Sequence, residues 1–464
     1  MSRGRRIAYI VAALIAAIII VAPPLYTRLF PLPTRYLSDE EHFKYGSVGV
    51  EPVAGVPFEV WRALPGVCMS AEKKALGYRQ FGFQWEAGHA APIGMPIETA
   101  IVPRVGVNCA LCHVGRVTGP GGATRLLVGA PNATLDLQAY LRFLFSCASG
   151  AQYRAGPILD EIARQGGDLN LAQRLFYRLV IIPQTKAAIL RQQRDFAFTD
   201  AQPDWGPGRV DGFNPAKIQV LKRPYDGTLD VVDMPPLWAL GRRAGGAWHW
   251  DGLQTSLHEV FLNSGIGNGA SARTIDLPSL DRMERWTTSL PPTPYPFAID
   301  HALAGAGHAV FQRACADCHA PGGGKTGQVI PIGWVRTDRN RLDSWTPDAL
   351  EAFRAIDDYP WRYTHFRKTG GYVAAPLDGI WARAPYLHNG SVPTLSALLS
   401  PAERRPVEFG RGSAAYDTAR VGFASDRGKR FDTRLPGNGN GGHPYGADLP
   451  STDKAALIEY LKTL

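Results

Sequence analysis

The chain has 464 residues and a formal net charge of +9, and it contains 50 glycines and 37 prolines. This length accommodates two domains with separate cores, and so much glycine and proline favours a loop-rich fold with short helices. The basic residues are spread along the chain instead of forming a run. This argues against a nucleic-acid partner and favours a mildly acidic partner or a negatively charged membrane surface.

The amino terminus has the features of a membrane anchor. Three arginines within residues 1–6 precede an uncharged apolar run, Ile7–Ala22. With its next neighbours this run reaches about 20 residues, the length that crosses the hydrocarbon core of a bilayer. Because the arginines favour the cytoplasmic side, we predict a single-pass anchor within residues 1–30 in the inner (cytoplasmic) membrane, with the body in the periplasm. A cleaved signal peptide is the alternative, disfavoured by Pro23 directly after the run.

Two short motifs carry the chemistry of this sequence, Cys109–His113 (CALCH) and Cys315–His319 (CADCH). Two thiols three residues apart can add to the vinyl groups on one edge of a porphyrin, and the adjoining histidine then becomes the proximal iron ligand. The repeated pattern predicts two covalently bound haems c (iron). The attachment residues would be Cys109, Cys112, Cys315 and Cys318, and the proximal ligands His113 and His319.

A thioredoxin-like redox pair and a zinc site are the alternatives for these four cysteines. A redox pair does not require the adjoining histidine. Zinc held by two widely separated pairs is awkward in an exported, oxidised protein. Haem attachment is therefore the preferred interpretation.

Two further cysteines, Cys68 and Cys147, lie outside the haem motifs. An even remainder in an oxidising compartment is compatible with a disulfide. Two separate buried thiols are the alternative, because sequence alone does not show the geometry that a disulfide needs.

Apolar residues recur at helical spacing in four segments, which predicts helices over 135–145, 171–191, 298–314 and 452–464. Four prolines within 291–296 exclude helix there, so we place the domain boundary at this segment. The predicted parts are an anchor over 1–30, a first haem domain over 31–296 with an insertion around 150–230, and a second haem domain over 297–464. The predicted fold class is mainly α and loop-rich, with two cytochrome c-like haem domains after an N-terminal transmembrane anchor.

The sixth iron ligand of the second haem can be narrowed by elimination. The last methionine is Met283, so the second domain offers no thioether ligand. Downstream of the haem motif, where this ligand normally lies, the remaining candidates are His365, His388 and His443. We predict His443, because the glycines around it (NGNGGHPY) allow the backbone to approach a porphyrin closely. An iron with two imidazole ligands is closed to substrate and suited to electron transfer.

The first haem has no comparably clear sixth ligand. His89, Met95, His249 and His258 are candidates, but an open or water-occupied position is the preferred interpretation, and it would be the site of O₂ or peroxide chemistry. Between the haem motifs lies Trp248–Gly252 (WHWDG). These aromatic residues are either ordinary core or an electron bridge between the porphyrins.

Together these motifs resemble the bacterial di-haem cytochrome c peroxidase superfamily, which includes the amine-maturing di-haem enzymes and the rubber oxygenases. The resemblance rests on the two haem motifs, on Trp250–Gly252 with the following Ser256-Leu257, and on Arg383–Leu395 (RAPYLHNGSVPTL). It runs from about Gly106 to the end, with 150–230 poorly matched.

The resemblance implies roles for three residues. The segment around His443 is most similar to the rubber-oxygenase branch, where the matching histidine is the sixth ligand of the second haem. Trp250 would stand between the haems as a catalytic relay. His388 would lie near the inter-domain haem environment without binding iron.

The sequence departs from the family at the distal positions. Counted from Trp250 without gaps, the peroxidases' distal Gln falls on Val260 and their distal Glu on Ala270, while the rubber oxygenases' distal Phe falls on Gly265. Glu259 is one residue away. Without an acid or base beside the iron, cleavage of an O–O bond loses its proton shuttle.

These observations predict a membrane-anchored periplasmic di-haem c-type cytochrome. It would be a peroxidase-like or oxygenase-like oxidoreductase, with O₂ or peroxide chemistry at the first haem and electron relay through the second. Its partners would be a periplasmic or membrane electron-transfer protein and a small oxidant. The alternative is a pure electron-transfer cytochrome with both haems six-coordinate.

Overall fold

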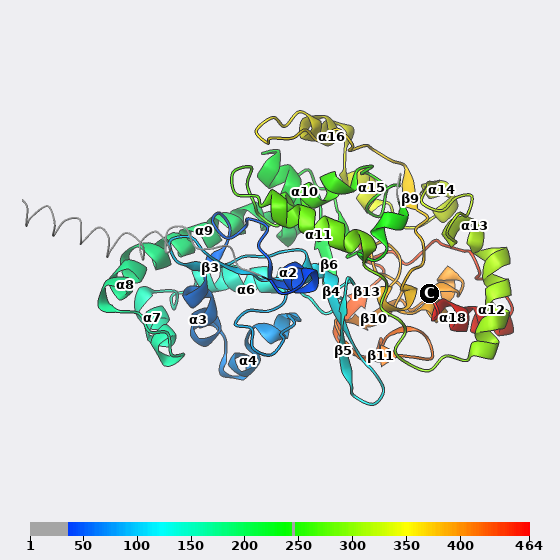
Figure 1. Cartoon of the computed structure of the whole chain (residues 1–464), viewed down its shortest axis with the longest axis horizontal. Helices are drawn as coiled ribbons and strands as arrows, with labels where there is room; N and C mark the ends of the chain where they lie inside the picture. Colours follow the sequence, from blue (N-terminus) through cyan, green and yellow to red (C-terminus); the bar gives the residue numbers. More distant parts are fainter. Residues whose placement is uncertain (1–35, 244–245) are drawn as a thin grey trace, which may run out of the picture.

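The computed structural model describes residues 36–243 and 246–464. Within these ranges short helices are joined by long loops, and the strands form small antiparallel sheets (Figure 1). The helices before the proline-rich segment are α2 (Asp39–Tyr45), α3 (Phe58–Cys68), α4 (Ala71–Leu76), α5 (Ala110–His113), α6 (Leu137–Ser149), α7 (Ala155–Arg164), α8 (Leu171–Phe176), α9 (Ile182–Asp195), α10 (Leu257–Gly267) and α11 (Leu277–Ser289). Those after it are α12 (His301–Ala314), α13 (Ala316–His319), α14 (Ile332–Val335), α15 (Asn340–Ser344), α16 (Pro347–Arg354), α17 (Leu395–Leu398) and α18 (Ser451–Leu461).

The largest described sheet has three strands in the order β1 (Val56–Pro57), β3 (Pro103–Val105) and β2 (Ile97–Thr99). The other sheets are two-stranded antiparallel pairs. They are β4 (Val114–Thr118) with β5 (Thr124–Val128), β6 (Arg209–Asp211) with β7 (Val231–Asp233), β8 (Val329–Pro331) with β9 (Gly371–Val373), β10 (Glu408–Arg411) with β13 (Lys429–Asp432), and β11 (Tyr416–Asp417) with β12 (Gly422–Phe423).

All four helices predicted from periodicity are present, with shifted ends. The segment 135–145 becomes α6, 298–314 becomes α12, and 452–464 becomes α18. The segment 171–191 is interrupted by a π-helical turn, Tyr177–Ile181, which separates α8 from α9. The proline-rich segment 291–296 lies between α11 and α12, and the division into domains there stays a prediction.

Helices α12 and α18 cross in close contact at one end of the molecule, where Figure 1 shows them side by side. Their apolar faces include Val310 and Phe311 on α12 and Leu457 and Leu461 on α18. Gly307 lies at the crossing point, and a Cβ atom there would be only 1.9 Å from the carbonyl oxygen of Ala456. Glycine is therefore required for this approach, which brings the chain end beside the helix that leads into the second haem motif.

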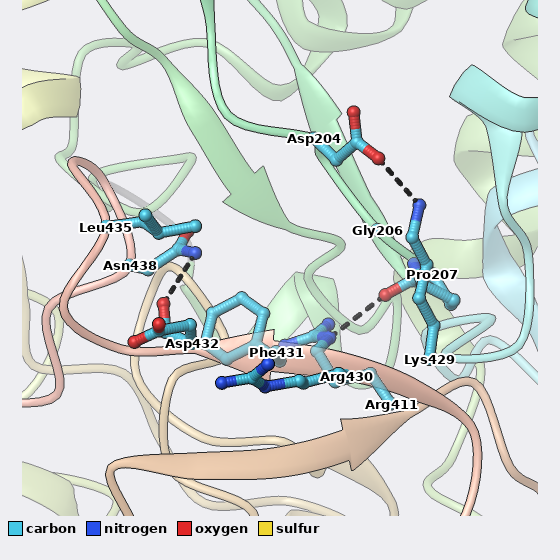
Figure 2. A pocket seen from close by; sticks show the side chains of 10 residues that line it. All are labelled: Asp204, Gly206, Pro207, Arg411, Lys429, Arg430, Phe431, Asp432, Leu435 and Asn438. Atoms are coloured by element: carbon cyan, nitrogen blue, oxygen red, sulfur yellow. Dashed lines mark hydrogen bonds and ion pairs between the residues drawn. The ribbon is translucent and has the colours of Figure 1, made fainter.

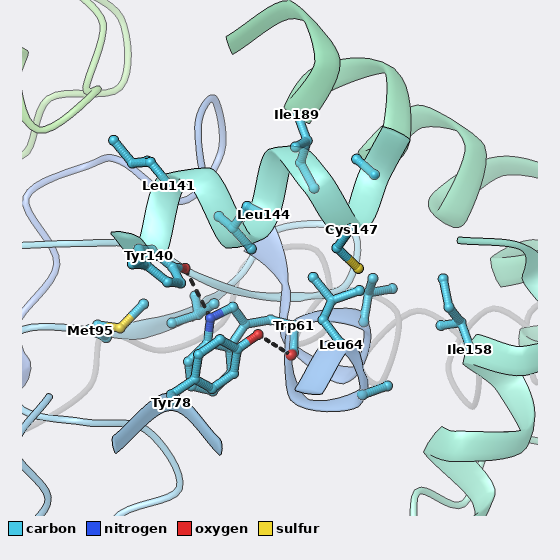
Figure 3. Packing of buried hydrophobic residues seen from close by; sticks show 14 of the residues in the cluster. Trp61, Leu64, Tyr78, Met95, Tyr140, Leu141, Leu144, Cys147, Ile158 and Ile189 are labelled. Atoms are coloured by element: carbon cyan, nitrogen blue, oxygen red, sulfur yellow. Dashed lines mark hydrogen bonds between the residues drawn. The ribbon is translucent and has the colours of Figure 1, made fainter. Parts of the chain in front are cut away.

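The amino-terminal half has an aromatic core built around α3 and α6 (Figure 3). Trp61 stacks on Tyr78 with ring centres 4.2 Å apart. The Nε1–H of Trp61 donates to the hydroxyl of Tyr140 at 3.1 Å, and the hydroxyl of Tyr78 donates to the carbonyl of Trp61 at 2.6 Å. The polar atoms of these buried rings are thus hydrogen-bonded, as burial requires.

A disulfide joins Cys68, the last residue of α3, to Cys147 in α6, with Cα atoms 5.5 Å apart. Of the two possibilities that the sequence left open, the disulfide is the one found. It ties α3 to α6 at the edge of the aromatic core shown in Figure 3.

Replacing both cysteines by alanine should lower the free energy of unfolding by about 2–5 kcal/mol, because the disulfide closes a long loop and restricts the unfolded chain. The two residues are 79 positions apart. Urea unfolding followed by far-ultraviolet circular dichroism measures the change, with Ser146→Ala on the exposed side of α6 as the control. An unchanged midpoint in the double variant would contradict this contribution.

The predicted transmembrane anchor within residues 1–30 lies outside the described residues. Among residues 36–243 and 246–464, no helix has both the length and the apolar character needed to cross a membrane. For the described part of the chain, the anchored fold class and the inner-membrane location are therefore wrong.

Candidate haem sites

The first haem motif occupies a single helical turn, α5, which is held by Asn108 just before it. The side chain of Asn108 accepts from the backbone N–H of Ala110 at 2.9 Å and donates to the carbonyls of Phe43 and Gly46 at 3.1 and 2.8 Å. A Cβ atom on Gly94 would lie 2.0 Å from the backbone nitrogen of Leu111. Glycine at 94 therefore lets a neighbouring loop lie directly against the turn that carries both thiols.

His113 ends this turn and runs directly into β4. Its carbonyl accepts from the backbone N–H of Gly129 at 2.8 Å, which fixes the backbone at the ligand position. Burial lowers the pKa of His113 to about 4, although the nearby backbone of Pro235 has a smaller, raising effect. The ring is thus neutral near pH 7, the form that binds a metal.

The second haem motif follows α12 without a break and forms the short helix α13. The Nδ1 atom of His319 lies 2.7 Å from the carbonyl oxygen of Ala375, to which it donates. That hydrogen bond leaves Nε2 without a proton and free to bind iron, which is the usual support of a metal-binding histidine. Burial also lowers the pKa of His319.

His443 faces His319 across the second site. The two ring centres are 6.2 Å apart, with 36° between the ring planes. Two imidazoles on opposite sides of one metal would have centres about 6 Å apart, since each bond is about 2 Å and each ring centre lies about 1 Å beyond its nitrogen. Burial lowers the pKa of His443 to about 4, with a smaller effect of His319. This pair therefore fits a haem iron between the rings.

The loop that carries His443 is held by backbone contacts. Gly442 has a φ of +83°, and a Cβ atom on it would lie 2.5 Å from the backbone nitrogen of Thr337. The N–H of His443 donates to the carbonyl of Val335 at 2.7 Å. The guanidinium of Arg405 donates to the carbonyls of Asn440, Gly442 and His443 at 2.6, 2.9 and 3.3 Å. The glycines permit this conformation, and Arg405 holds it.

The other two histidines proposed for the second iron have different surroundings. His365 is exposed, and its Nδ1 atom is 2.5 Å from a carboxylate oxygen of Glu259. His388 is buried and stacks on Tyr372, with its Nε2 atom 3.0 Å from the Tyr372 hydroxyl. The described contacts of His319 include the ring of His443 and neither of these two histidines.

Trp250 is hydrogen-bonded to the two chain segments that lie beside the proximal histidines, His113 and His319. Its Nε1–H donates to the carbonyl of Asp233 at 2.7 Å, and Asp233 ends β7 two residues before Pro235, which lies beside His113. Its carbonyl accepts from the N–H of Val373 at 2.8 Å, and Val373 ends β9 two residues before Ala375, the partner of His319. The structure thus brings Trp250 between segments that lead to both haem motifs.

Buried charges join the two halves of the chain around Trp250. Arg341 pairs with Asp230 and with Asp251, each at 3.1 Å, and all three side chains are almost fully buried. In the same way Arg411 pairs with Asp233 at 3.1 Å. Aspartates from the first half thus meet arginines from the second half, and these contacts fix Trp250 relative to both motifs.

The four candidate ligands for the first iron differ in their accessibility. His89 is exposed and stacks on Tyr45, with ring centres 3.8 Å apart. Met95 is buried within the aromatic core. His258 is exposed and lies 2.9 Å from Glu284. His249, beside Trp250, differs because its buried Nε2 atom has no hydrogen-bond partner and burial lowers its pKa to about 4.

No acid or base stands at the counted distal positions, two of which lie on α10 and the third just after it. Val260 and Ala270 are apolar, and a Cβ atom on Gly265 would touch Ile275 and Leu280 at 3.1 Å. Glu259 is occupied elsewhere, since its carboxylate accepts from Gln254 at 3.1 Å and from the backbone N–H groups of Thr364 and His365 at 3.1 and 3.2 Å. Burial raises the pKa of Glu259, but its hydrogen bonds, above all the one with the His365 side chain, leave this pKa below its ordinary value. Glu259 is therefore a structural carboxylate.

An open pocket of about 360 Å³ lies over β10 and β13. Figure 2 shows that its polar side chains already have partners: Lys429 donates to Asp204, Arg411 to the carbonyl of Pro207, and Asn438 to the carbonyl of Asp432, each at 3.0 Å. None of the residues that line it belongs to a haem motif. The pocket is thus separate from both candidate haem sites.

Sequence reasoning missed the residues that hold the ligands, namely Asn108, Ala375 and Arg405. Asn108 had a local signal, because Asn often bonds the backbone two residues further on. Ala375 and Arg405 act on residues far away in sequence, through a backbone carbonyl and a buried guanidinium. No local pattern identifies such partners.

Comparison with known proteins places part of the chain among cytochromes. Residues 371–409 match a family described as RoxA-like, cytochrome c-like. At this coarse level the match supports a haem-binding cytochrome related to the rubber oxygenases, and the wider likeness to di-haem peroxidases stays a prediction. The matched segment includes β9, Ala375 and His388.

Two curated proteins of Sinorhizobium fredii (strain NBRC 101917 / NGR234) are similar to this chain. "Uncharacterized protein y4iJ" is 28% identical over 487 aligned residues, covering 80% of this chain and 78% of the relative. "Uncharacterized protein y4iM" is 35% identical over 222 residues, covering 42% of this chain and 50% of the relative.

Proposed function

We propose that this protein is a di-haem c-type cytochrome that acts as an oxidoreductase, with O₂ or peroxide reacting at the first haem and electrons passing through the second. The observation that carries the proposal is the pair His319 and His443, whose rings face each other 6.2 Å apart. The cytochrome c-like match over 371–409 supports the same class.

Bound haem would supply a redox-active iron at each motif. Cys109 and Cys112 would hold one porphyrin and Cys315 and Cys318 the other, and the four thiols are not in disulfides. His319 and His443 would fill both axial positions of the second site. Two histidine ligands leave no open position, so this site is suited to relay electrons.

Trp250 supports communication between the two sites. It is hydrogen-bonded to the strand ends that lead to His113 and to His319. The buried ion pairs of Arg341 hold the adjoining Asp251 in place. We therefore assign Trp250 as the aromatic bridge between the two haem sites. A partner redox protein would deliver electrons to the second site.

The side chains around α10 favour O₂ chemistry over rapid peroxide cleavage. Val260, Gly265 and Ala270 offer no proton, and Glu259 is held by Gln254, Thr364 and His365. Without a positioned acid or base, the heterolysis of an O–O bond is slow.

His249 supports a second candidate function. Its buried Nε2 atom has no hydrogen-bond partner, and it is the direct neighbour of Trp250. If His249 filled the sixth position of the first iron, both sites would be closed and the protein would be an electron carrier.

Two covalent haems per chain are expected by pyridine haemochrome assay of the purified protein. Because the two motifs are independent, replacing Cys315 and Cys318 by alanine should reduce the value to one, and replacing Cys109 and Cys112 should do the same. Replacing Cys68 and Cys147 is the control and should leave two. A value of one in the unsubstituted protein, or haem extracted by acidic acetone, would contradict the proposal.

Reduced protein exposed to CO should show a shifted spectrum for one haem only, because CO binds an iron with an open position. If CO binds neither haem in the unsubstituted protein but binds one in His249→Ala, the electron-carrier function is correct. Trp250→Ala should slow electron exchange between the haems after flash photolysis of CO, while Trp250→Phe, which keeps an aromatic ring, should slow it less. Trp334→Ala, at an exposed Trp, is the control.

A further inference from the structure

An apolar stripe lies on the outer surface of α8 and the π-helical turn. Its members Leu171, Leu175, Phe176 and Leu179 are 85%, 55%, 37% and 65% exposed. The three leucines are four residues apart, so they lie on one face of the helix. Single exposed apolar side chains are common, but a contiguous apolar patch on a protein surface marks an interaction site.

The local structure turns this stripe outward and holds it there. Asn170 and Gln173 form a capping box that starts α8. The helix then continues through the π turn into α9, which buries Ile182 and Ile189, whereas α8 buries no residue. The extra residue of a π turn rotates the two helical faces relative to each other. Figure 1 shows α8 at the end of the molecule opposite α12 and α18.

The charges beside the stripe have one sign. From Leu171 to Arg194 there is no acidic residue. The ion pairs of the described residues near α8, such as Arg164 with Glu161, include none of the arginines between Leu171 and Arg194. The basic residues of the segment are Arg174, Arg178, Lys186, Arg191 and Arg194.

We propose that this stripe binds the surface of an anionic phospholipid layer, with α8 parallel to the surface and the leucines at the headgroup boundary. An apolar helix face flanked by arginines is the pattern of an interfacial helix. Anionic headgroups complement the unpaired arginines. Residues 1–35 have five arginines and no acidic residue, so they offer no charge complementary to the arginines beside the stripe, and a second copy would carry the same positive charge.

Nitroxide labelling of the full-length holoprotein tests the proposal locally. A label on Leu175→Cys is compared in vesicles of phosphatidylglycerol with phosphatidylcholine, in vesicles of phosphatidylcholine alone, and without lipid. With anionic vesicles, the label should become more accessible to O₂ and less accessible to a nickel chelate. A label on Ala306→Cys, exposed on α12, should not change. Unsubstituted protein treated with label reports any reaction of the native cysteines.

Charge variants identify the cause of binding. Arg174→Gln with Arg178→Gln should raise the lipid concentration for half-maximal immersion of the label by roughly tenfold. Arg285→Gln with Arg404→Gln, at exposed positions elsewhere, removes the same charge and should leave it unchanged. An equal response to neutral vesicles, no response to either, or shielding of the label without lipid would overturn the proposal; the last would indicate a protein partner.

Discussion

Replacing His443 by alanine should convert one haem of the purified protein from low spin to high spin and leave the other unchanged. The ring of His443 faces His319 at 6.2 Å between centres, and its removal opens one axial position of that iron. Electron paramagnetic resonance and absorption spectra of the oxidised protein measure the change. In the variant, CO should bind the second haem as well as the first.

Two further variants show whether the effect is specific. His443→Met keeps a ligand, so the site should stay low-spin while its potential rises, as for Met/His irons. His308→Ala, at an exposed position on α12, should leave both haems unchanged. If the spectrum of His443→Ala equals that of the unsubstituted protein, the assignment passes to His365 or His388.

Replacing Arg341 by methionine should destabilise the protein by about 3–5 kcal/mol, because it leaves buried carboxylates without a countercharge. Asp230 and Asp251 both pair with Arg341 in the buried region between the two halves. Urea unfolding measures the loss. Arg339→Met, whose partner Asp343 is exposed, is the matched control and should cost about 0–1 kcal/mol. Equal losses in the two variants would contradict the role of Arg341.

The effect of Arg341→Met should depend on pH in one direction. Burial raises the pKa of Asp230 well above its ordinary value of 3.8, and Arg341 opposes this rise. Without Arg341 the folded-state pKa rises further. A carboxyl group whose pKa is raised in the folded state destabilises the protein once the pH exceeds the pKa of that group in the unfolded state. The destabilisation should therefore be largest near pH 7 and shrink as the pH falls toward 4.

Restoring the balance of charge provides the complementary test. A variant with Asp230→Asn, Asp251→Asn and Arg341→Met removes all three charges together. Since a buried ion pair can be replaced by neutral groups at little net cost, this variant should be more stable than Arg341→Met alone. If it is less stable, the hydrogen bonds of the group matter more than its charges.

The residues that would attach and ligate each haem could be predicted from the sequence, because they are close together in the chain. Each haem motif lies in a single helical turn, α5 or α13, so the relation of thiols and histidine needs no tertiary contact. Helices such as α12 and α18 followed from the periodicity of their apolar residues. The absence of a methionine after Met283 narrowed the ligand of the second iron to three histidines.

The other features of the sites depend on tertiary contacts, because they involve residues that are far apart in the chain. Only the fold brings His443 against His319, places His388 on Tyr372, and engages His365 with Glu259. Glu259 shows the reason clearly: counted along the sequence it lies one residue from a catalytic position, but in the structure its carboxylate holds a segment about a hundred residues away, as buried charges require partners. The two haem motifs can be read directly from the sequence, whereas long-range packing selects the side chains that face them.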